Sequence, residues 1–272
     1  MPRYAANLSL LFTELPFEHR FEAAAKAGFE GVEFGYPQNL SLTRVSNELK
    51  QHGLTMVMGT LPHTDVGDKG VAALPGLEQE FRNRLAQGVE AAVAFSCNLL
   101  HVTTGLVSAH HMSDARLQFA RNIDYALRLA EDNQLTLLIE AINQKDVPDY
   151  FIRSLNDAVS WVEQIDSDRF KLLIDFYHAS SSGVPVDTAA SLLLSHGAHA
   201  QIAGFPGRAE PDTGDIDYRD VLKKLDNAGY PGWVGCEYKP SQNTIEGLSW
   251  RKKVEPVAQT PTTHKAFPQE TI

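Results

Sequence analysis

The chain has 272 residues, 43% of them hydrophobic and 21% charged, and its 24 Lys and Arg against 34 Asp and Glu give a formal net charge of −10. A chain of this length can bury a core of its own, and α/β barrels often use about 250 residues as one domain. The acidic balance argues against nucleic acid or a membrane surface as the main partner, and two cysteines are too few for a disulfide framework. The sequence shows no targeting pattern and no apolar stretch of about 18 residues, so we expect a cytoplasmic protein, with a homo-oligomer left open.

Short apolar runs alternate along the chain with longer segments in which apolar residues recur every three or four positions. The runs predict eight strands, over 4–11, 31–34, 55–59, 99–103, 136–140, 171–175, 198–203 and 233–237. The periodic segments predict a helix after each strand, over 17–27, 41–52, 77–95, 114–132, 154–165, 187–195, 217–228 and 243–253. Eight strand–helix units predict an α/β fold with one closed (β/α)8 TIM barrel over 1–253. An open doubly wound sheet is the alternative, but no Gly-x-Gly-x-x-Gly turn follows the first predicted strand.

Two connections are too long for simple turns, and one terminal segment has no periodicity. The connections 60–76 and 204–216 are rich in Gly, Pro and Asp, and long loops in compact domains are usually lids or binding loops. Residues 254–272 contain three prolines, so we expect a disordered tail there.

Three of the predicted strands end in a residue with a carboxylate side chain. Glu140, Asp175 and Glu237 each end an apolar run, and Gln201 lies between apolar residues of the seventh strand. In a TIM barrel the chemistry sits at the carboxyl ends of the strands, so these side chains should meet at one rim. Any one of them alone could be a capping or ion-paired residue, but converging like charges repel unless a cation lies among them. Three carboxylates and one amide oxygen are ligands suited to Mg²⁺ or Mn²⁺.

Other polar residues close to the predicted rim are candidates for substrate binding. His178, three positions after Asp175, could donate to a substrate hydroxyl or carbonyl, and its alternative role is that of a helix-start residue. Asn7 and His101, on the first and fourth strands, are weaker candidates, because polar residues also fill barrel interiors. We include Asn7 among the substrate-binding residues.

The loop after the seventh strand carries a candidate for binding an acid. Arg208 could hold a carboxylate through two parallel hydrogen bonds, and its alternative role is an ion pair within the loop. Glu210 follows it in the same loop, and Lys239 could bind an acid from the loop after the eighth strand.

The chain resembles the hydroxypyruvate isomerase family of xylose isomerase-like TIM barrels from about Tyr4 to Trp250, in the motifs NLSLLFTELPFEHRFEAAAKAGFEGVEF, AALPG, LLIEAIN, LLIDFYHA, HAQIAGFPGRAEPDTGDIDY and GWVGCEYKP. The resemblance implies a metal site formed by Glu140, Asp175, Gln201 and Glu237. It also implies that the two glutamates act as the acid/base pair on a small sugar-acid substrate.

The sequence departs from this family in the loop after the third predicted strand. That loop lacks the family's tryptophan and the arginine that follows Pro-Gly, where this chain has Leu77, and HVTTG at 101–105 replaces the more usual run. Because loops at the rim shape the pocket, these differences leave the substrate open.

The resemblance predicts a metal-assisted aldose–ketose isomerase. It would convert hydroxypyruvate to tartronate semialdehyde, or a 2-oxo-tetronate to its 3-oxo isomer, by glutamate-mediated proton transfer through an enediolate. A ketose 3-epimerase or inosose dehydratase on the same barrel is the first alternative, although those relatives usually have histidine where this chain has Gln201. An endonuclease for abasic DNA would need several histidines and a basic groove. A non-catalytic sugar-acid-binding protein is the remaining alternative.

Overall fold

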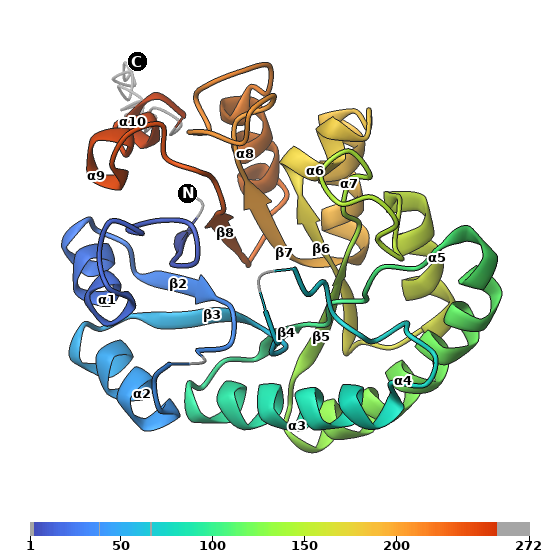
Figure 1. Cartoon of the computed structure of the whole chain (residues 1–272). Helices are drawn as coiled ribbons and strands as arrows, with labels where there is room; N and C mark the ends of the chain where they lie inside the picture. Colours follow the sequence, from blue (N-terminus) through green and yellow to red (C-terminus); the bar gives the residue numbers. More distant parts are fainter. Residues whose placement is uncertain (1–2, 38, 66, 255–272) are drawn as a thin grey trace, which may run out of the picture.

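Eight parallel strands close into a barrel that helices surround in the computed structural model, which describes residues 3–37, 39–65 and 67–254 (Figure 1). The strands are β1 (Arg3–Asn7), β2 (Gly31–Phe34), β3 (Thr55–Thr60), β4 (Leu99–His101), β5 (Thr136–Glu140), β6 (Phe170–Asp175), β7 (Gly197–Ile202) and β8 (Trp233–Cys236). The helices are α1 (Phe17–Lys26), α2 (Leu42–Gln51), α3 (Glu78–Ala94), the 3₁₀ turn η1 (Ala109–His111), α4 (Met112–Asp132), α5 (Leu155–Ile165), α6 (Phe176–Ser181), α7 (Val186–His196), α8 (Tyr218–Asn227), α9 (Thr244–Gly247) and α10 (Trp250–Val254). The predicted TIM barrel is confirmed.

The first and last strands complete the barrel. β1 pairs with β2 on one side and in parallel with β8 on the other, where Arg3 lies opposite Trp233 and Ala6 opposite Cys236. Since every neighbouring pair is parallel, the carboxyl ends of all the strands open at the same rim. None of the helices among the described residues combines the length and apolar character needed to cross a membrane.

The structure differs from the predicted elements mainly near the rim. β1 ends at Asn7 and not at residue 11, because the Asn7 carbonyl accepts from the N–H groups of Leu10 and Leu11 in a turn. The short helix α6 was not predicted, and it starts directly after Asp175. The segment predicted as one helix over 243–253 forms α9 and α10, and the predicted tail lies outside the described residues beyond Val254.

The core has two layers, one inside the barrel and one between strands and helices. Side chains inside the barrel form a small apolar cluster of Ala5, Val57, Met58, Leu138 and Leu173. A polar layer shares the barrel interior, and in it Glu33 is fully buried. Gly235 on β8 makes room for that carboxylate, since a Cβ there would lie 2.5 Å from Glu33 Oε2.

Candidate active site

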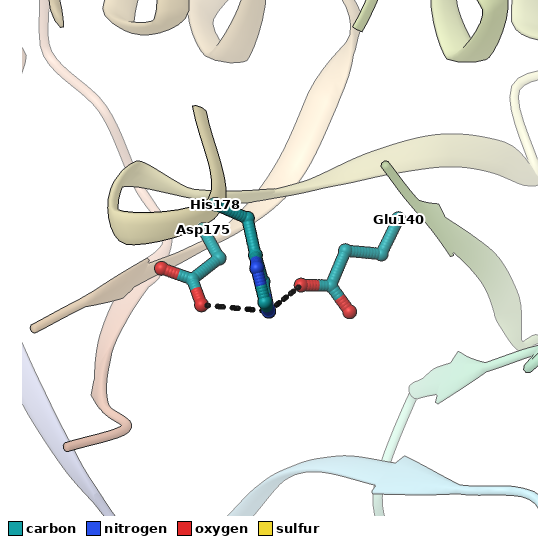
Figure 2. A group of neighbouring side chains, drawn as sticks. All are labelled: Glu140, Asp175 and His178. Atoms are coloured by element: carbon teal, nitrogen blue, oxygen red, sulfur yellow. Dashed lines mark ion pairs between the residues drawn. The ribbon is translucent and has the colours of Figure 1, made fainter. Parts of the chain in front are cut away.

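Four residues that the sequence places at strand ends are brought to the same rim. Glu140 and Asp175 end β5 and β6, Gln201 lies in β7, and Glu237 directly follows β8. One ligand atom from each of Glu140, Asp175 and His178 lies within 4.8 Å of the other two, and all three residues are buried (Figure 2). This arrangement is a candidate metal site in which the histidine accompanies the predicted carboxylates.

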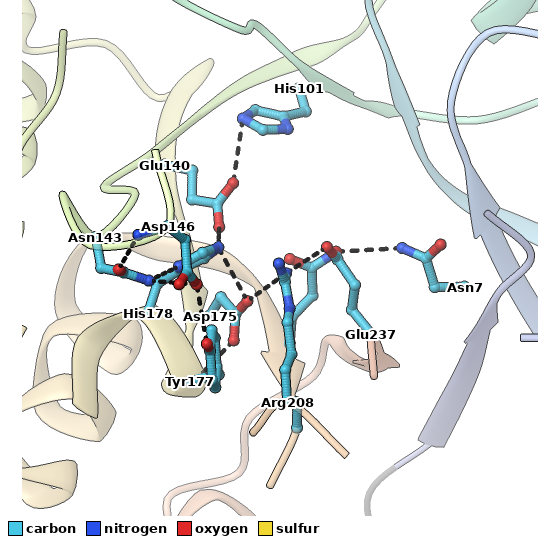
Figure 3. A network of polar contacts seen from close by, with 12 residues as sticks. Asn7, His101, Glu140, Asn143, Asp146, Asp175, Tyr177, His178, Arg208 and Glu237 are labelled. Atoms are coloured by element: carbon cyan, nitrogen blue, oxygen red, sulfur yellow. Dashed lines mark hydrogen bonds and ion pairs between the residues drawn. The ribbon is translucent and has the colours of Figure 1, made fainter. Parts of the chain in front are cut away.

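Arg208 reaches between two of these carboxylates (Figure 3). Its Nη2 atom lies 3.1 Å from Asp175 Oδ2 and 2.6 Å from Glu237 Oε1. Burial opposes the charge of Arg208, but Glu237 and Asp175 raise its pKa above the ordinary value. The other oxygen of Asp175 accepts from the backbone N–H of Tyr177 at 2.8 Å and caps α6. In this structure the guanidinium is the cation that separates the two carboxylates.

Both rim glutamates hold their protons more tightly than an exposed carboxyl group does. Burial is the main cause of the raised pKa of Glu140, and the charges of Glu237 and Asp175 raise it further. Burial also raises the pKa of Glu237, with Arg208 opposing and Asp175 adding to the shift. Carboxyl groups in this situation are suited to exchange protons with a substrate near neutral pH.

A hydrogen-bond network sets the protonation of His178. The Oδ1 atom of Asn143 accepts from the backbone N–H groups of Lys145 and Asp146, so its amide nitrogen must be the atom that faces His178. That nitrogen donates to His178 Nδ1 at 2.6 Å, and it also donates to Asp146. Burial lowers the pKa of His178, so the ring is neutral and its proton is on Nε2, 3.8 Å from Glu140 Oε1.

A further buried carboxylate, Glu33 on β2, was not predicted from the sequence. It accepts hydrogen bonds from Asn7 Nδ2 at 2.9 Å, His199 Nε2 at 2.6 Å and Gln201 Nε2 at 2.7 Å. Asn7 also donates to Glu237 at 3.2 Å, so it links the inner carboxylate to the rim. The available signal was an acid inside the otherwise apolar strand GVEF.

Glu33 also orients the amide of Gln201. Because Gln201 Nε2 donates to Glu33, its Oε1 atom is free, and this buried oxygen has no hydrogen-bond partner among the described residues. A buried carbonyl oxygen without a donor is destabilising unless something binds it. The oxygen-rich set of Glu140, Asp175, Gln201 and Glu237 therefore fits a hard divalent cation.

The rim opens into a cavity of about 470 Å³, whose lining residues are Asn7, Ser9, Leu10, Phe34, Gly35, Tyr36, Met58, Thr60, Leu61, His63, Lys69, His101, Thr103, Glu140, Gln201 and Glu237. His101 Nε2 lies 3.7 Å from Glu140 Oε2, and burial lowers the pKa of His101 to about 3. The long connection after β3 supplies His63 and Lys69, and the connection after β7 supplies Arg208 at the neighbouring carboxylates.

Of the five predicted substrate-binding residues, Asn7 lines the cavity, His178 and Arg208 lie beside the rim carboxylates, and Glu210 and Lys239 make other contacts. The carboxylate of Glu210 accepts from the backbone N–H and the hydroxyl of Ser241, at 2.9 and 2.6 Å, and so fastens one loop to another. Lys239 is exposed, and its backbone N–H donates to the carbonyl of Arg208 at 2.7 Å. Their role in substrate binding stays a prediction, since the contacts described for these two residues are with neighbouring loops.

The chain is similar along most of its length to several known proteins. Residues 21–254 match the family model described as xylose isomerase-like TIM barrel. The chain is 36% identical over 256 residues to a 2-oxo-tetronate isomerase of Haemophilus influenzae, covering 93% of this chain and 99% of that protein. It is 34% identical to the hydroxypyruvate isomerase of Escherichia coli, covering 92% of this chain and 98% of that protein. A crystal structure of an AP endonuclease, family 2, from Brucella melitensis superposes with a TM-score of 0.90 at 37% identity, covering 94% of this chain and all of that one.

Proposed function

The chain belongs to the hydroxypyruvate isomerase family of xylose isomerase-like TIM barrels and is an isomerase, and from this premise we propose that it interconverts the 2-oxo and 3-oxo forms of a short sugar acid. Hydroxypyruvate and the 2-oxo-tetronates are the substrates we propose. The main support for the proposal is that Glu140 and Glu237 line one cavity together with Gln201, whose side-chain oxygen has no hydrogen-bond partner among the described residues.

We propose that Mg²⁺ or Mn²⁺ is held by Glu140, Asp175, Gln201 and Glu237, with His178 beside it. When bound, such a cation supplies Lewis-acid stabilisation of the negative charge that develops on the substrate oxygens. The buried oxygen of Gln201, which has no partner among the described residues, supports the assignment, as does the close approach of the buried carboxylates of Glu140 and Asp175.

The surroundings of the two glutamates differ, and we propose that they divide the proton transfer accordingly. Glu237 accepts charge-assisted and amide hydrogen bonds from Arg208 and Asn7, which favour its carboxylate form, so it removes the proton from carbon 3. Glu140 faces the neutral rings of His101 and His178 and returns a proton at carbon 2, while the hydroxyl proton passes from the oxygen on carbon 3 to the oxygen on carbon 2. Proton exchange with water then restores the starting protonation states of the two glutamates. His178 donates its Nε2–H to a substrate oxygen, and Arg208 holds Glu237 in position.

The observations favour an isomerase over the other classes. A nuclease needs a basic surface for the phosphate backbone, whereas this cavity wall carries two glutamates and the chain has a net charge of −10. A ketose 3-epimerase on the same barrel remains the second candidate, and ketohexoses in the substrate panel test it. Both cysteines are free thiols, which supports the cytoplasmic location that we propose.

Solvent-isotope exchange tests which glutamate removes the substrate proton and which one returns it. With Mg²⁺ or Mn²⁺ present, Glu237→Gln and Glu140→Gln should each lose isomerisation by about 10²–10⁴-fold. In D₂O, Glu140→Gln should still exchange the carbon-3 proton of the substrate, and Glu237→Gln should not. Glu131→Gln, at an exposed position of α4, is the matched control. Full activity in either rim variant contradicts the mechanism. If Glu237→Gln exchanges the carbon-3 proton and Glu140→Gln does not, Glu140 is the residue that removes the proton and Glu237 the one that returns it.

A further inference from the structure

An enzyme for sugar acids needs a group for the substrate's own carboxylate, and the predicted groups are not available for it. The guanidinium of Arg208 is held by Asp175 and Glu237 (Figure 3). Lys239 is exposed and is not among the residues that line the cavity. An acid entering this cavity also meets the negative charges of the rim. A cation on the cavity wall, apart from the proposed metal, would hold the substrate carboxylate against this charge.

Lys69 is such a cation. Among the described residues that line the cavity, it is the one with a permanent positive charge. Burial lowers the pKa values of the other basic side chains there, His63 and His101, so both are neutral at neutral pH. Within the described parts of the chain, no carboxylate oxygen lies within 4.0 Å of the Lys69 ammonium, which leaves it available to a ligand.

The backbone around Lys69 is anchored on both sides. The carboxylate of Asp68 accepts from the N–H groups of Thr64 and Gly70, each at 2.8 Å, and pairs with Arg84 at 2.5 Å. The carbonyl of Lys69 accepts from the N–H of Gly105 at 2.9 Å. The backbone at Lys69 is therefore held in place on both sides.

The packing of the next residue confirms how closely this loop sits on its neighbour. Gly70 has φ +94° and forms an antiparallel bridge with Thr104, and a Cβ on Gly70 would clash with the carbonyl of Thr103. The backbone of Lys69 is thus fixed before a ligand binds, so binding costs little backbone entropy.

We propose that Lys69 binds the carboxylate of the substrate and selects sugar acids over neutral sugars. The inference rests on the proposed function and adds the residue that recognises the acid end. Lys69 lines the same cavity as Glu140 and Glu237, so one small substrate in that cavity could contact all three. Lys69 does not take part in proton transfer, so its removal should weaken acid binding more than turnover.

Substitutions at Lys69 test this role with substrates and with inhibitors. Lys69→Met should raise KM for 2-oxo-tetronate about 10–100-fold with a smaller change in kcat, and Lys69→Arg should recover part of the loss. Glycerate should compete more weakly against Lys69→Met by a similar factor. Glycerol, in which a hydroxymethyl group replaces the carboxylate, should compete equally against both proteins. Lys50→Met, at an exposed position of α2, is the control.

Binding measured by calorimetry separates this inference from the proposed function. If the wild-type protein isomerises sugar acids and Lys69→Met keeps its KM and its glycerate affinity, the assignment of Lys69 is overturned and the function stands. If the wild-type protein isomerises none of them, the function fails. In that case Lys69 retains its role only if glycerate binds the wild-type protein and not Lys69→Met, and equal or absent binding overturns the inference.

Discussion

The amide nitrogen of Asn143 lies 2.6 Å from Nδ1 of His178. The backbone N–H groups of Lys145 and Asp146 occupy the amide oxygen, so Asn143 can only donate to the ring. The neutral tautomer of His178 with its proton on Nε2 follows from this contact, and that proton faces the rim carboxylates.

Replacing Asn143 by aspartate should reverse the polarity of that contact. A carboxylate accepts and does not donate, so Nδ1 should become protonated, and the donor proton on Nε2 is lost or the ring becomes charged. We expect kcat to fall by about 10–100-fold with little change in overall stability. Ring ¹⁵N spectra should report the new tautomer, and Asn156→Asp on the exposed face of α5 is the control. An unchanged His178 spectrum contradicts the assignment.

Gln201→Ala should weaken metal binding. The variant removes the buried oxygen that has no partner among the described residues, while the three carboxylates of the rim stay in place. We expect the affinity for Mn²⁺ to fall at least about 10-fold, measured by calorimetry on the metal-free protein. Gln164→Ala, at an exposed position of α5, should bind Mn²⁺ as the wild type does. Equal affinity in the two variants would exclude Gln201 as a ligand.

Glu33→Ala should destabilise the barrel although Glu33 is not at the rim. Its carboxylate accepts from Asn7, His199 and Gln201 in the barrel interior. Its removal leaves the donors of His199 and Gln201 without this acceptor and leaves Asn7 with Glu237 alone. We expect the free energy of unfolding to drop by about 3 kcal/mol in urea denaturation. Glu30→Ala, exposed just before β2, should change it little. If the free energy of unfolding falls as little as in the control, water replaces the hydrogen bonds of Glu33 with little loss of stability.

Asp68→Asn should lower stability at neutral pH but not in acid. Burial opposes the charge of Asp68, but hydrogen bonds from Thr64, Gly70 and Arg84 lower its pKa from 3.8 to about 2. Because the folded-state pKa is depressed, the stabilisation is full above pH 3.8 and is lost as the pH falls toward 2.

We expect the variant to unfold about 1–2 kcal/mol more easily at neutral pH, with the difference from wild type shrinking below about pH 4. Urea unfolding at stepped pH measures this difference. Asp124→Asn, at a side chain that is 71% exposed, is the control. A difference that stays constant into acid contradicts the role of the charged carboxylate.

Much of the architecture could be predicted from local patterns. The strands 31–34 and 136–140 match β2 and β5, because short apolar runs between glycine or polar residues leave little freedom in where a buried strand starts and stops. Helix α6 was missed, since its start depends on the side chain of Asp175 capping the chain at the rim. A six-residue helix carries too little periodicity to be seen.

By itself the sequence determined the barrel and the acids at the ends of its strands, because alternation and periodicity are local properties of the chain. The tertiary structure decided which polar groups face one another. Asn7 meets Glu237 across 230 positions, and Glu33 meets Gln201 across 168, only because the closed barrel brings their strands to a common interior. The same closure directs Arg208 to the carboxylates and Lys69 into the cavity, while Lys239 stays outside. Contacts between distant segments depend on the geometry of closure, which the spacing of residues along the chain does not record.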